Sequence, residues 1–364
     1  MDEMNKLKEI VSQFIGDDMN VEVNPLGKGH INDSYKVVSG DKEYVLQRIN
    51  HNIFKNVHQL QSNIQRVTEH IRKKLEEQGV PDVDRRVLTL VPTLDGALYY
   101  QDTIGDYWRV MDFIKESKSY DEINPELAYR AGMAFGDFQK MLADLPGEPL
   151  FETIPNFHNM EARLEIFREA VKANKAGRLD KVAGLVKEIE DRAEEMCKAE
   201  KLHREGKLPK RINHCDTKVN NVLFDNGDQV LCVVDLDTVM PGYVLSDFGD
   251  FIRTGANTGA EDDKNLENVS VDLDIFEAYA KGYLKNAVSF LTDVEINNLA
   301  FGAKLLTYMQ MVRFFTDYID GDTYYKIAYP EHNFMRTKAQ FKLLQSLEEN
   351  FEKMQQIVKE AARG

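Results

Sequence analysis

The stretch His214-Cys215-Asp216-Thr217-Lys218-Val219-Asn220-Asn221 is followed directly by two short runs of β-branched and apolar residues. These runs, 222–225 and 229–235, lie on either side of Asn226-Gly227. Asn-Gly is a strong hairpin signal, because both residues tolerate a positive φ. We therefore expect a β-hairpin that returns the chain to its starting point and ends in Asp235-Leu236-Asp237.

Such a hairpin would bring Asn221 and Asp235 to the same end of a strand pair, with Asp216 a short loop upstream. Carboxylate and amide oxygens suit Mg²⁺, which usually takes one or two carboxylates and completes its shell with water and substrate phosphates. The order His-x-Asp-x-x-x-x-Asn, strand pair, Asp is also that of the catalytic parts in protein-kinase-like phosphotransferases. In those enzymes the first Asp orients and deprotonates the attacking hydroxyl, and the Asn and the later Asp hold the metal.

Two other interpretations of this stretch are a metal hydrolase and a solvated loop before an ordinary hairpin. A hydrolase site would need further ligands, but no second histidine follows His214 at a spacing such as His-x3-His. The rest of the chain has to decide between these interpretations.

Composition narrows the class of protein. A chain of 364 residues has room for two lobes with substantial cores. Its formal net charge of −15 argues against a nucleic-acid partner, and no apolar run approaches the roughly 20 residues of a membrane helix. Three cysteines give neither a disulfide framework nor a zinc spacing, which favours a reducing cytoplasm.

Residues 1–115 have the pattern of a β-rich nucleotide-binding lobe. Short β-branched runs joined by turns predict an antiparallel sheet, and an amphipathic helix precedes it. One long helix is inserted and ends at Gly79, with Pro81 just beyond. The expected helices are 3–16 and 57–77, and the expected strands are 21–26, 31–38, 43–49, 87–91, 97–101 and 108–114.

The turn between the first two strands contains Gly27-Lys28-Gly29-His30. Glycines without Cβ atoms let backbone N–H groups approach a phosphate closely, so Gly27, Lys28 and Gly29 are candidates for ATP binding. Adenine would lie against the 108–114 connection, whose last residues are Asp112, Phe113 and Ile114.

Residues 116–364 change character to helices and would form a larger catalytic and substrate-binding lobe. Together the two lobes predict an α+β, protein-kinase-like bilobal fold with a cleft for the nucleotide. Asp247 and Asp250 are expected to support this site structurally, by capping a helix and holding the catalytic loop. The expected helices are 125–145, 160–173, 179–206, 245–253, 276–284, 294–318 and 337–362.

The chain resembles the aminoglycoside phosphotransferase and choline kinase superfamily and, within it, the N-acetylhexosamine 1-kinases. The resemblance spans almost the whole chain. It is carried by Gly27-Lys28-Gly29-His30-Ile31-Asn32, Tyr44-Val45-Leu46-Gln47, the 214–221 stretch, Asp235-Leu236-Asp237-Thr238-Val239-Met240-Pro241-Gly242, Asp247-Phe248-Gly249-Asp250, Arg313 and Tyr329-Pro330-Glu331-His332-Asn333.

The resemblance implies ATP-dependent phosphorylation of the anomeric hydroxyl of GlcNAc or GalNAc. Asp216 would be the base, and Asn221 and Asp235 would hold Mg²⁺. Arg313, Tyr324 and His30 would contact the sugar. An alternative for Arg313 is an i,i+4 ion pair with Asp317, which would leave it no role at the substrate.

One departure from the usual kinase pattern concerns the third strand. Kinases of this architecture place a phosphate-binding lysine there, whereas this sequence has Gln47. Lys28, Arg48 and Lys218 are candidates for the missing cation. Lys218 lies two residues from Asp216 and can also stabilise charge on the transferred group.

Two further functions stay open. The same chemistry could act on another alcohol, such as choline, homoserine or an aminoglycoside. A nucleotide-binding pseudokinase is the third hypothesis, and Gln47 is its only support. The expected partners in every case are ATP and a small molecule, with neither nucleic acid nor membrane.

Overall fold

A computed structural model describes residues 3–17, 20–27 and 31–364. Lys28, Gly29 and His30, three of the predicted binding residues, lie outside the described residues. The chain divides into two compact units, and each is described by itself. The first comprises Met1–Lys118, Asp144–Ile154 and Leu223–Met240, and the second comprises Ser119–Ala143, Pro155–Val222 and Pro241–Gly364.

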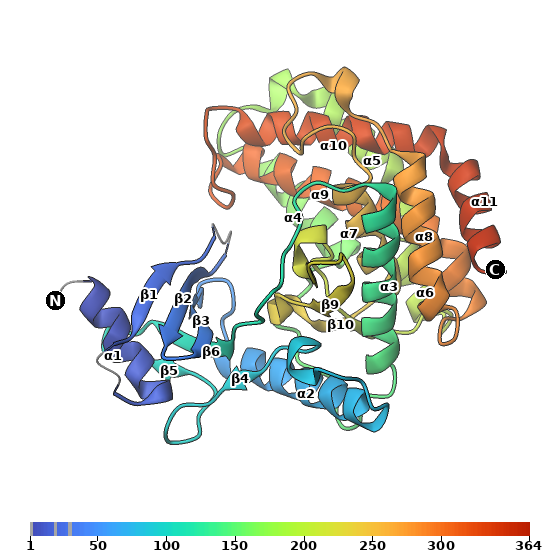
Figure 1. The fold of residues 1–364 in the computed structure, drawn as a ribbon. Coiled ribbons are helices and arrows are strands. Elements are labelled where there is room, and N and C mark those ends of the chain that lie inside the picture. The colour runs from blue at the N-terminus through green and yellow to red at the C-terminus, as the bar shows by residue number, and fades with distance from the viewer. Residues whose placement is uncertain (1–2, 18–19, 28–30) are drawn as a thin grey trace. The chain divides into compact units, whose positions relative to one another are not determined.

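The first unit is built on an antiparallel sheet in the order β1-β2-β3-β6-β4, with β5 paired to β6 (Figure 1). In β3, Tyr44, Leu46 and Ile49 are buried and the other residues are half-buried or exposed, whereas four consecutive residues of β6, 108–111, are all buried. The predicted strands are confirmed, although the fourth and fifth are shorter than expected. Their bounds are β1 Glu22–Pro25, β2 Asp33–Ser39, β3 Lys42–Ile49, β4 Leu90–Val91, β5 Tyr100–Gln101 and β6 Tyr107–Asp112.

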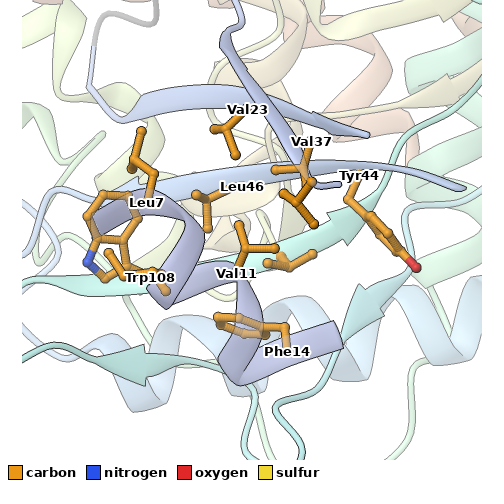
Figure 2. Packing of buried hydrophobic residues seen from close by; sticks show 11 residues of the cluster. Leu7, Val11, Phe14, Val23, Val37, Tyr44, Leu46 and Trp108 are labelled. Atoms are coloured by element: carbon orange, nitrogen blue, oxygen red, sulfur yellow. The ribbon is translucent and has the colours of Figure 1, made fainter. Parts of the chain in front are cut away.

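Helix α1 (Glu3–Ile15) covers this sheet with its apolar stripe. Figure 2 shows Leu7, Val11 and Phe14 of the helix lying against Leu46 and Trp108 of the strands. The second predicted helix is α2 (Val57–Glu77), whose first turn is capped by the Asn56 side chain. A short 3₁₀ helix, η1 (Val83–Arg85), follows it.

The predicted hairpin is confirmed as β8 (Val222–Phe224) and β9 (Val230–Val233). Its turn differs from the expectation: the positive φ lies at Asp228 (61°) and not at Asn226-Gly227. The Asp225 carboxylate accepts the N–H groups of Gly227 (2.8 Å) and Gln229 (2.9 Å), and this fixes a longer turn.

The hairpin belongs to the first unit, although the sequence boundary at 115/116 would assign it to the helical half. The backbone of Lys118 pairs with Phe224, with N···O distances of 2.9 and 2.8 Å. Arg86 donates to the carbonyl of Val230 at 2.6 Å. These hydrogen bonds connect the hairpin to Arg86, which follows η1, and to Lys118, which follows β6.

The second unit is mainly helical. Its longest helix, α9 (Asp293–Asp320, 28 residues), is buried along most of its length and begins in a capping box between Thr292 and Glu295. The predicted helices are confirmed, but two of them are interrupted, at Cys197 and at Asn350. The other helices are α3 Pro125–Leu142, α4 Met160–Ala173, α5 Ala183–Met196, α6 Lys198–Arg204, α7 Val244–Gly255, α8 Leu273–Ala287, α10 His332–Glu349 and α11 Phe351–Ala361.

Short elements complete the chain. Strand β7 (Arg211–Asn213) pairs with β10 (Met240–Gly242). The remaining 3₁₀ helices are η2 Leu179–Lys181, η3 Val219–Asn221, η4 Leu236–Thr238 and η5 Leu266–Asn268. Among the described residues no helix is both long and apolar enough to cross a membrane.

Glycines let two helix pairs of the second unit approach closely. Helices α3 and α8 lie side by side (Figure 1), and a Cβ at Gly282 would lie 2.0 Å from the carbonyl oxygen of Tyr129. Helices α7 and α9 meet in the same way, because a Cβ at Gly249 would lie 2.0 Å from the carbonyl oxygen of Gly302. Backbone atoms cannot move aside as a flexible side chain can, so these contacts require glycine.

Gly282→Ala is expected to destabilise the protein by about 1–3 kcal/mol, because the added methyl group overpacks the α3–α8 contact. Gly184→Ala on α5 is the matched control, since a Cβ there meets nothing within 4 Å. Denaturant unfolding monitored by circular dichroism measures both variants. Equal stability of the two variants would contradict the close packing of α3 on α8.

Candidate active site

The catalytic loop, residues 214–221, lies in the second unit and is held by a buried carboxylate. Asp247 on α7 accepts the backbone N–H groups of His214 and Cys215, each at 2.8 Å. Gln139 of α3 donates to the same carboxylate at 2.7 Å. Burial raises the pKa of Asp247 to about 6, although His214 and the hydrogen bonds to the carboxylate act in the opposite direction.

The predicted support by Asp247 is therefore confirmed for the loop, but its capping role is wrong. Helix α7 begins at Val244 without a side-chain cap, and Asp247 lies within its first turn. Asp250 has a matching role one turn later, where it accepts the Thr217 N–H at 3.1 Å and pairs with Arg253 at 3.0 Å. Two acids on one helix thus fix the loop backbone on both sides of Asp216.

The residue before Asp216 has a left-handed backbone conformation. Cys215 has φ of 64°, a conformation that costs a non-glycine residue about 1 kcal/mol and persists only when the surroundings hold it. The Asp216 side chain remains 25% exposed, while its neighbour Cys215 is buried. The loop thus keeps this carboxylate accessible to solvent.

Asp216 contacts two predicted partners. Lys218 Nζ lies 2.8 Å from Asp216 Oδ1. Burial alone would lower the pKa of Lys218, but the carboxylates of Asp216 and Asp250 hold that pKa above its ordinary value. Asn221 Nδ2 donates to the Asp216 carbonyl at 2.8 Å and reaches its carboxylate at 3.3 Å. The structure therefore brings Asp216, Lys218 and Asn221 together.

Asp235 belongs to the first unit, where it follows β9 and starts η4 in the left-handed region (φ 60°, ψ 59°). Two residues later, Asp237 is buried and accepts from the Arg109 guanidinium and from Asn32 Nδ2 (2.6 Å). Thr153 donates its hydroxyl to the Asp237 carbonyl at 2.9 Å. The segment carrying Asp235 is therefore anchored on several sides.

Asn221 and Asp235 offer donors that fit magnesium. The Asn221 side chain donates hydrogen bonds from its NH₂ group to Asp216. Its Oδ1 atom accepts no hydrogen bond from the described residues and can serve as a metal ligand. Asp235 contributes a carboxylate on an anchored turn. No group of three or more His, Cys, Asp or Glu residues in the described part of the chain could hold a metal. Mg²⁺ usually takes only one or two carboxylates from a protein and completes its shell with water and substrate phosphates, so its binding needs no such group.

The predicted nucleotide residues of the first unit follow two different strands: Gly27 follows β1, whereas Asp112 ends β6 and Phe113 and Ile114 follow it. Gly27 has φ of 66°, which suits a tight turn. The N–H groups of Asp112 and Phe113 donate to Thr89 and Glu43, each at 3.0 Å, whereas the Ile114 N–H has no acceptor among the described residues. Of these three amides, only that of Ile114 is available to an adenine ring.

Arg48 is engaged elsewhere. Its Nε donates to Asp33 at 2.9 Å and its Nη1 to Asp106 at 3.2 Å, and the side chain is 45% exposed. The buried cation next to Gln47 is instead Arg109, which the sequence analysis missed. Alternation along β6 places Arg109 on the face opposite Trp108 and Val110, so the sequence pattern predicts an exposed arginine, and only the pairing of β6 with β3 shows its contact with Gln47.

A cluster of aromatic and cationic side chains lies in the second unit, and we call Phe157, His158, Arg163, Arg313 and Tyr325 the aromatic–arginine cluster. The Arg313 guanidinium lies 5.2 Å from the Phe157 ring centre and 5.7 Å from that of Tyr325. Arg163 donates to the Phe157 carbonyl at 2.9 Å, and burial together with Arg313 lowers the pKa of Arg163 to about 10. Neither arginine has a carboxylate partner among the described residues.

His158 stacks on Phe157 with ring centres 4.5 Å apart. Burial, followed by the charges of Arg313 and Arg163, lowers the pKa of His158 to about 3, while Asp216 acts in the opposite direction. His158 is therefore neutral at pH 7. Its Nδ1 atom is buried and has no hydrogen-bond partner in the described part of the chain.

The alternative of an Arg313–Asp317 ion pair is wrong. Asp317 instead accepts the backbone N–H groups of Thr323 (2.8 Å), Tyr324 (2.8 Å) and Tyr325 (2.9 Å). This fixes the loop so that Tyr325 lies beside Arg313, whereas the predicted sugar contact Tyr324 is 60% exposed.

Asp247→Ala is expected to lower the free energy of unfolding by about 2–5 kcal/mol, because two buried backbone N–H groups lose their acceptor. Turnover should fall along with stability, since the loop around Asp216 is no longer fixed. Asp247→Asn keeps one acceptor oxygen and should fall between wild type and alanine. Thermal unfolding and a steady-state assay measure both effects, and wild-type values for alanine would exclude this anchoring role.

Comparison with known proteins agrees with this arrangement. A model of the phosphotransferase enzyme family matches residues 22–283, more than half of the chain. This segment includes the strands of the first unit, the catalytic loop and Asp235.

Solved structures share the fold over nearly the whole chain. An aminoglycoside phosphotransferase from Alicyclobacillus acidocaldarius is 13% identical with a TM-score of 0.59, over 95% of this chain and 96% of that chain. Spectinomycin phosphotransferase, solved with ADP and spectinomycin, is 14% identical with a TM-score of 0.58, over 96% and 98%. Choline kinase LicA from Streptococcus pneumoniae is 12% identical with a TM-score of 0.50, over 94% and 99%.

These likenesses confirm the predicted kinase-like bilobal α+β fold, with an antiparallel sheet lobe and a helical lobe. The chain therefore belongs to the phosphotransferase enzyme family.

Proposed function

We propose that this phosphotransferase is an ATP-dependent kinase that transfers the γ-phosphate to the anomeric hydroxyl of an N-acetylhexosamine, GlcNAc or GalNAc. The observation that carries the acceptor class is the aromatic–arginine cluster. It has two arginines without carboxylate partners and a histidine that is neutral at pH 7. Such groups donate hydrogen bonds to hydroxyl and carbonyl oxygens, and the rings can cover the apolar face of a sugar.

The same cluster argues against a cationic acceptor. An amino alcohol or an aminoglycoside would bring a positive charge toward Arg163 and Arg313, whose charges already lower the pKa of His158. Placing like charges together costs free energy, most of all where solvent is excluded. We therefore rank choline and aminoglycosides below N-acetylhexosamines as acceptors.

In the proposed reaction, the Asp216 carboxylate accepts the proton of the acceptor hydroxyl as that oxygen attacks the γ-phosphorus in line, and the bond from the γ-phosphorus to the β,γ-bridging oxygen breaks to release ADP. Lys218, 2.8 Å from Asp216, supplies a positive charge next to the transferred group. Asn221 and Asp235 would hold Mg²⁺, which neutralises the phosphate charges when bound. Gly27 and the Ile114 N–H are proposed to contact the nucleotide, while Lys28, Gly29 and His30 retain the phosphate and sugar roles predicted for them.

A second candidate acceptor is an alcohol that carries a carboxylate, such as homoserine. The two arginines of the cluster could pair with that carboxylate, since guanidinium groups match its geometry. A transfer assay with MgATP and GlcNAc, GalNAc, homoserine, choline and an aminoglycoside separates the candidates. ³¹P NMR of the product then shows whether the phosphate is attached to C1 of the sugar.

Asp216→Asn is expected to reduce turnover by about 10²–10⁴-fold, because proton acceptance and hydroxyl positioning are lost together. Its affinity for MgADP, measured by titration calorimetry, should stay within about twofold of wild type. A variant that retains more than about a tenth of the wild-type kcat would remove Asp216 from the role of base. A wild-type protein that binds MgATP but transfers phosphate to no acceptor would favour a pseudokinase.

Arg313→Ala is expected to lower kcat/KM for the sugar about 10- to 100-fold with little change in KM for ATP, because a donor to the acceptor is lost. Arg168→Ala is the matched control, since Arg168 is an exposed arginine of α4 paired with Glu190 at 2.7 Å. Both KM values are measured in each variant. A sugar kcat/KM that does not change in Arg313→Ala would show that Arg313 does not contact the acceptor.

A further inference from the structure

Gln47 occupies the third-strand position at which related kinases have a lysine, and its surroundings in the first unit show what replaces that charge. In the sheet register, Gln47 of β3 lies opposite Ser34 of β2 on one side and Arg109 of β6 on the other. Directly opposed residues on one face of a sheet are in contact range. The three side chains therefore form a row across the sheet.

Hydrogen bonds fix which end of the Gln47 amide group faces each neighbour. Gln47 Nε2 donates to the Ser34 hydroxyl at 2.9 Å, so its Oε1 is turned toward Arg109. Arg109 donates to that oxygen from Nε at 2.9 Å and from Nη2 at 2.7 Å. The Gln47 side chain therefore serves as the hydrogen-bond acceptor for a neighbouring guanidinium group.

The third donor group of Arg109, Nη1, pairs with the Asp237 carboxylate. Arg109 is only 2% exposed, so it cannot reach a phosphate in solvent. The other Asp237 oxygen accepts from Asn32, whose own Oδ1 accepts the Asn50 N–H at 2.9 Å. A buried ion pair keeps its charges only when its other donors and acceptors are also satisfied, and here they are.

We propose that Arg109 is the positioning residue that replaces the third-strand lysine: by holding Asp237 against Gln47, it fixes the turn that presents Asp235 to Mg²⁺. Asp235 lies two residues before Asp237 and is in the left-handed region, which the chain leaves unless it is anchored. Arg109 acts through Asp237 and not on the phosphates themselves. This inference rests on the proposed function only in that the chain binds MgATP.

The test measures nucleotide binding without any sugar. Titration calorimetry gives the Kd for ADP with and without Mg²⁺, and the ratio of the two reports the contribution of the metal. Arg109→Gln is expected to weaken MgADP binding at least tenfold while metal-free ADP binding stays within twofold. Arg192→Gln is the matched control, because it removes an arginine fork on Glu348 in the second unit and should leave the ratio unchanged.

A further variant separates positioning from loss of the fold. Thr153→Val removes only the hydroxyl that donates to the Asp237 carbonyl and should lower the metal contribution about threefold in a protein of wild-type thermal stability.

Outcomes that overturn the inference are equally definite. They are an unchanged ratio in folded Arg109→Gln or in Thr153→Val, or a wild-type protein in which Mg²⁺ adds nothing to ADP affinity. A protein that passes these binding tests but phosphorylates no N-acetylhexosamine would instead overturn the proposed acceptor and leave the role of Arg109 standing.

Discussion

The hydrogen bonds between the buried Asp247 carboxylate and the N–H groups of His214 and Cys215 are the interaction on which the catalytic loop depends. An unpaired N–H is costly in a buried environment, so the acceptor on α7 fixes the loop more firmly than packing alone could. It also holds Cys215 in a left-handed conformation that the chain would otherwise avoid. Asp216 stays 25% exposed between the buried residues Cys215 and Thr217.

A carboxylate that accepts several hydrogen bonds also holds two other loops, each within a single compact unit. Asp237 accepts from Arg109 and Asn32 and thereby anchors the turn at Asp235. Asp317 accepts three backbone N–H groups and thereby anchors the loop that carries Tyr325. In all three cases an acid in a helix or turn has no direct chemical role and holds a neighbouring segment in place. A negative net charge of −15 therefore says little about the polarity of the site.

Electrostatics in the second unit distinguish the phosphate-transfer loop from the aromatic–arginine cluster. Asp216 and Lys218 form an ion pair. Burial acts to lower the pKa of Lys218, but the carboxylates of Asp216 and Asp250 hold that pKa above its ordinary value. Burial, followed by the charges of Arg313 and Arg163, lowers the pKa of His158, and neither arginine has an acid partner among the described residues. The first arrangement suits proton acceptance beside a phosphate, and the second suits an acceptor rich in oxygen atoms. These two environments are the physical basis of the proposed function.

The sequence by itself determined the order of strands and helices, because apolar periodicity and turn residues are local properties. It also marked Asp216, Lys218 and Asn221, whose spacing along one short loop limits how far apart they can lie. Only the tertiary structure identified Arg109 as the cation beside Gln47, because the two residues are 62 positions apart in the chain and meet through the pairing of β3 with β6. It likewise showed that Asp317 holds a loop and does not pair with Arg313, since helix spacing gives proximity but not the direction in which a carboxylate finds its donors.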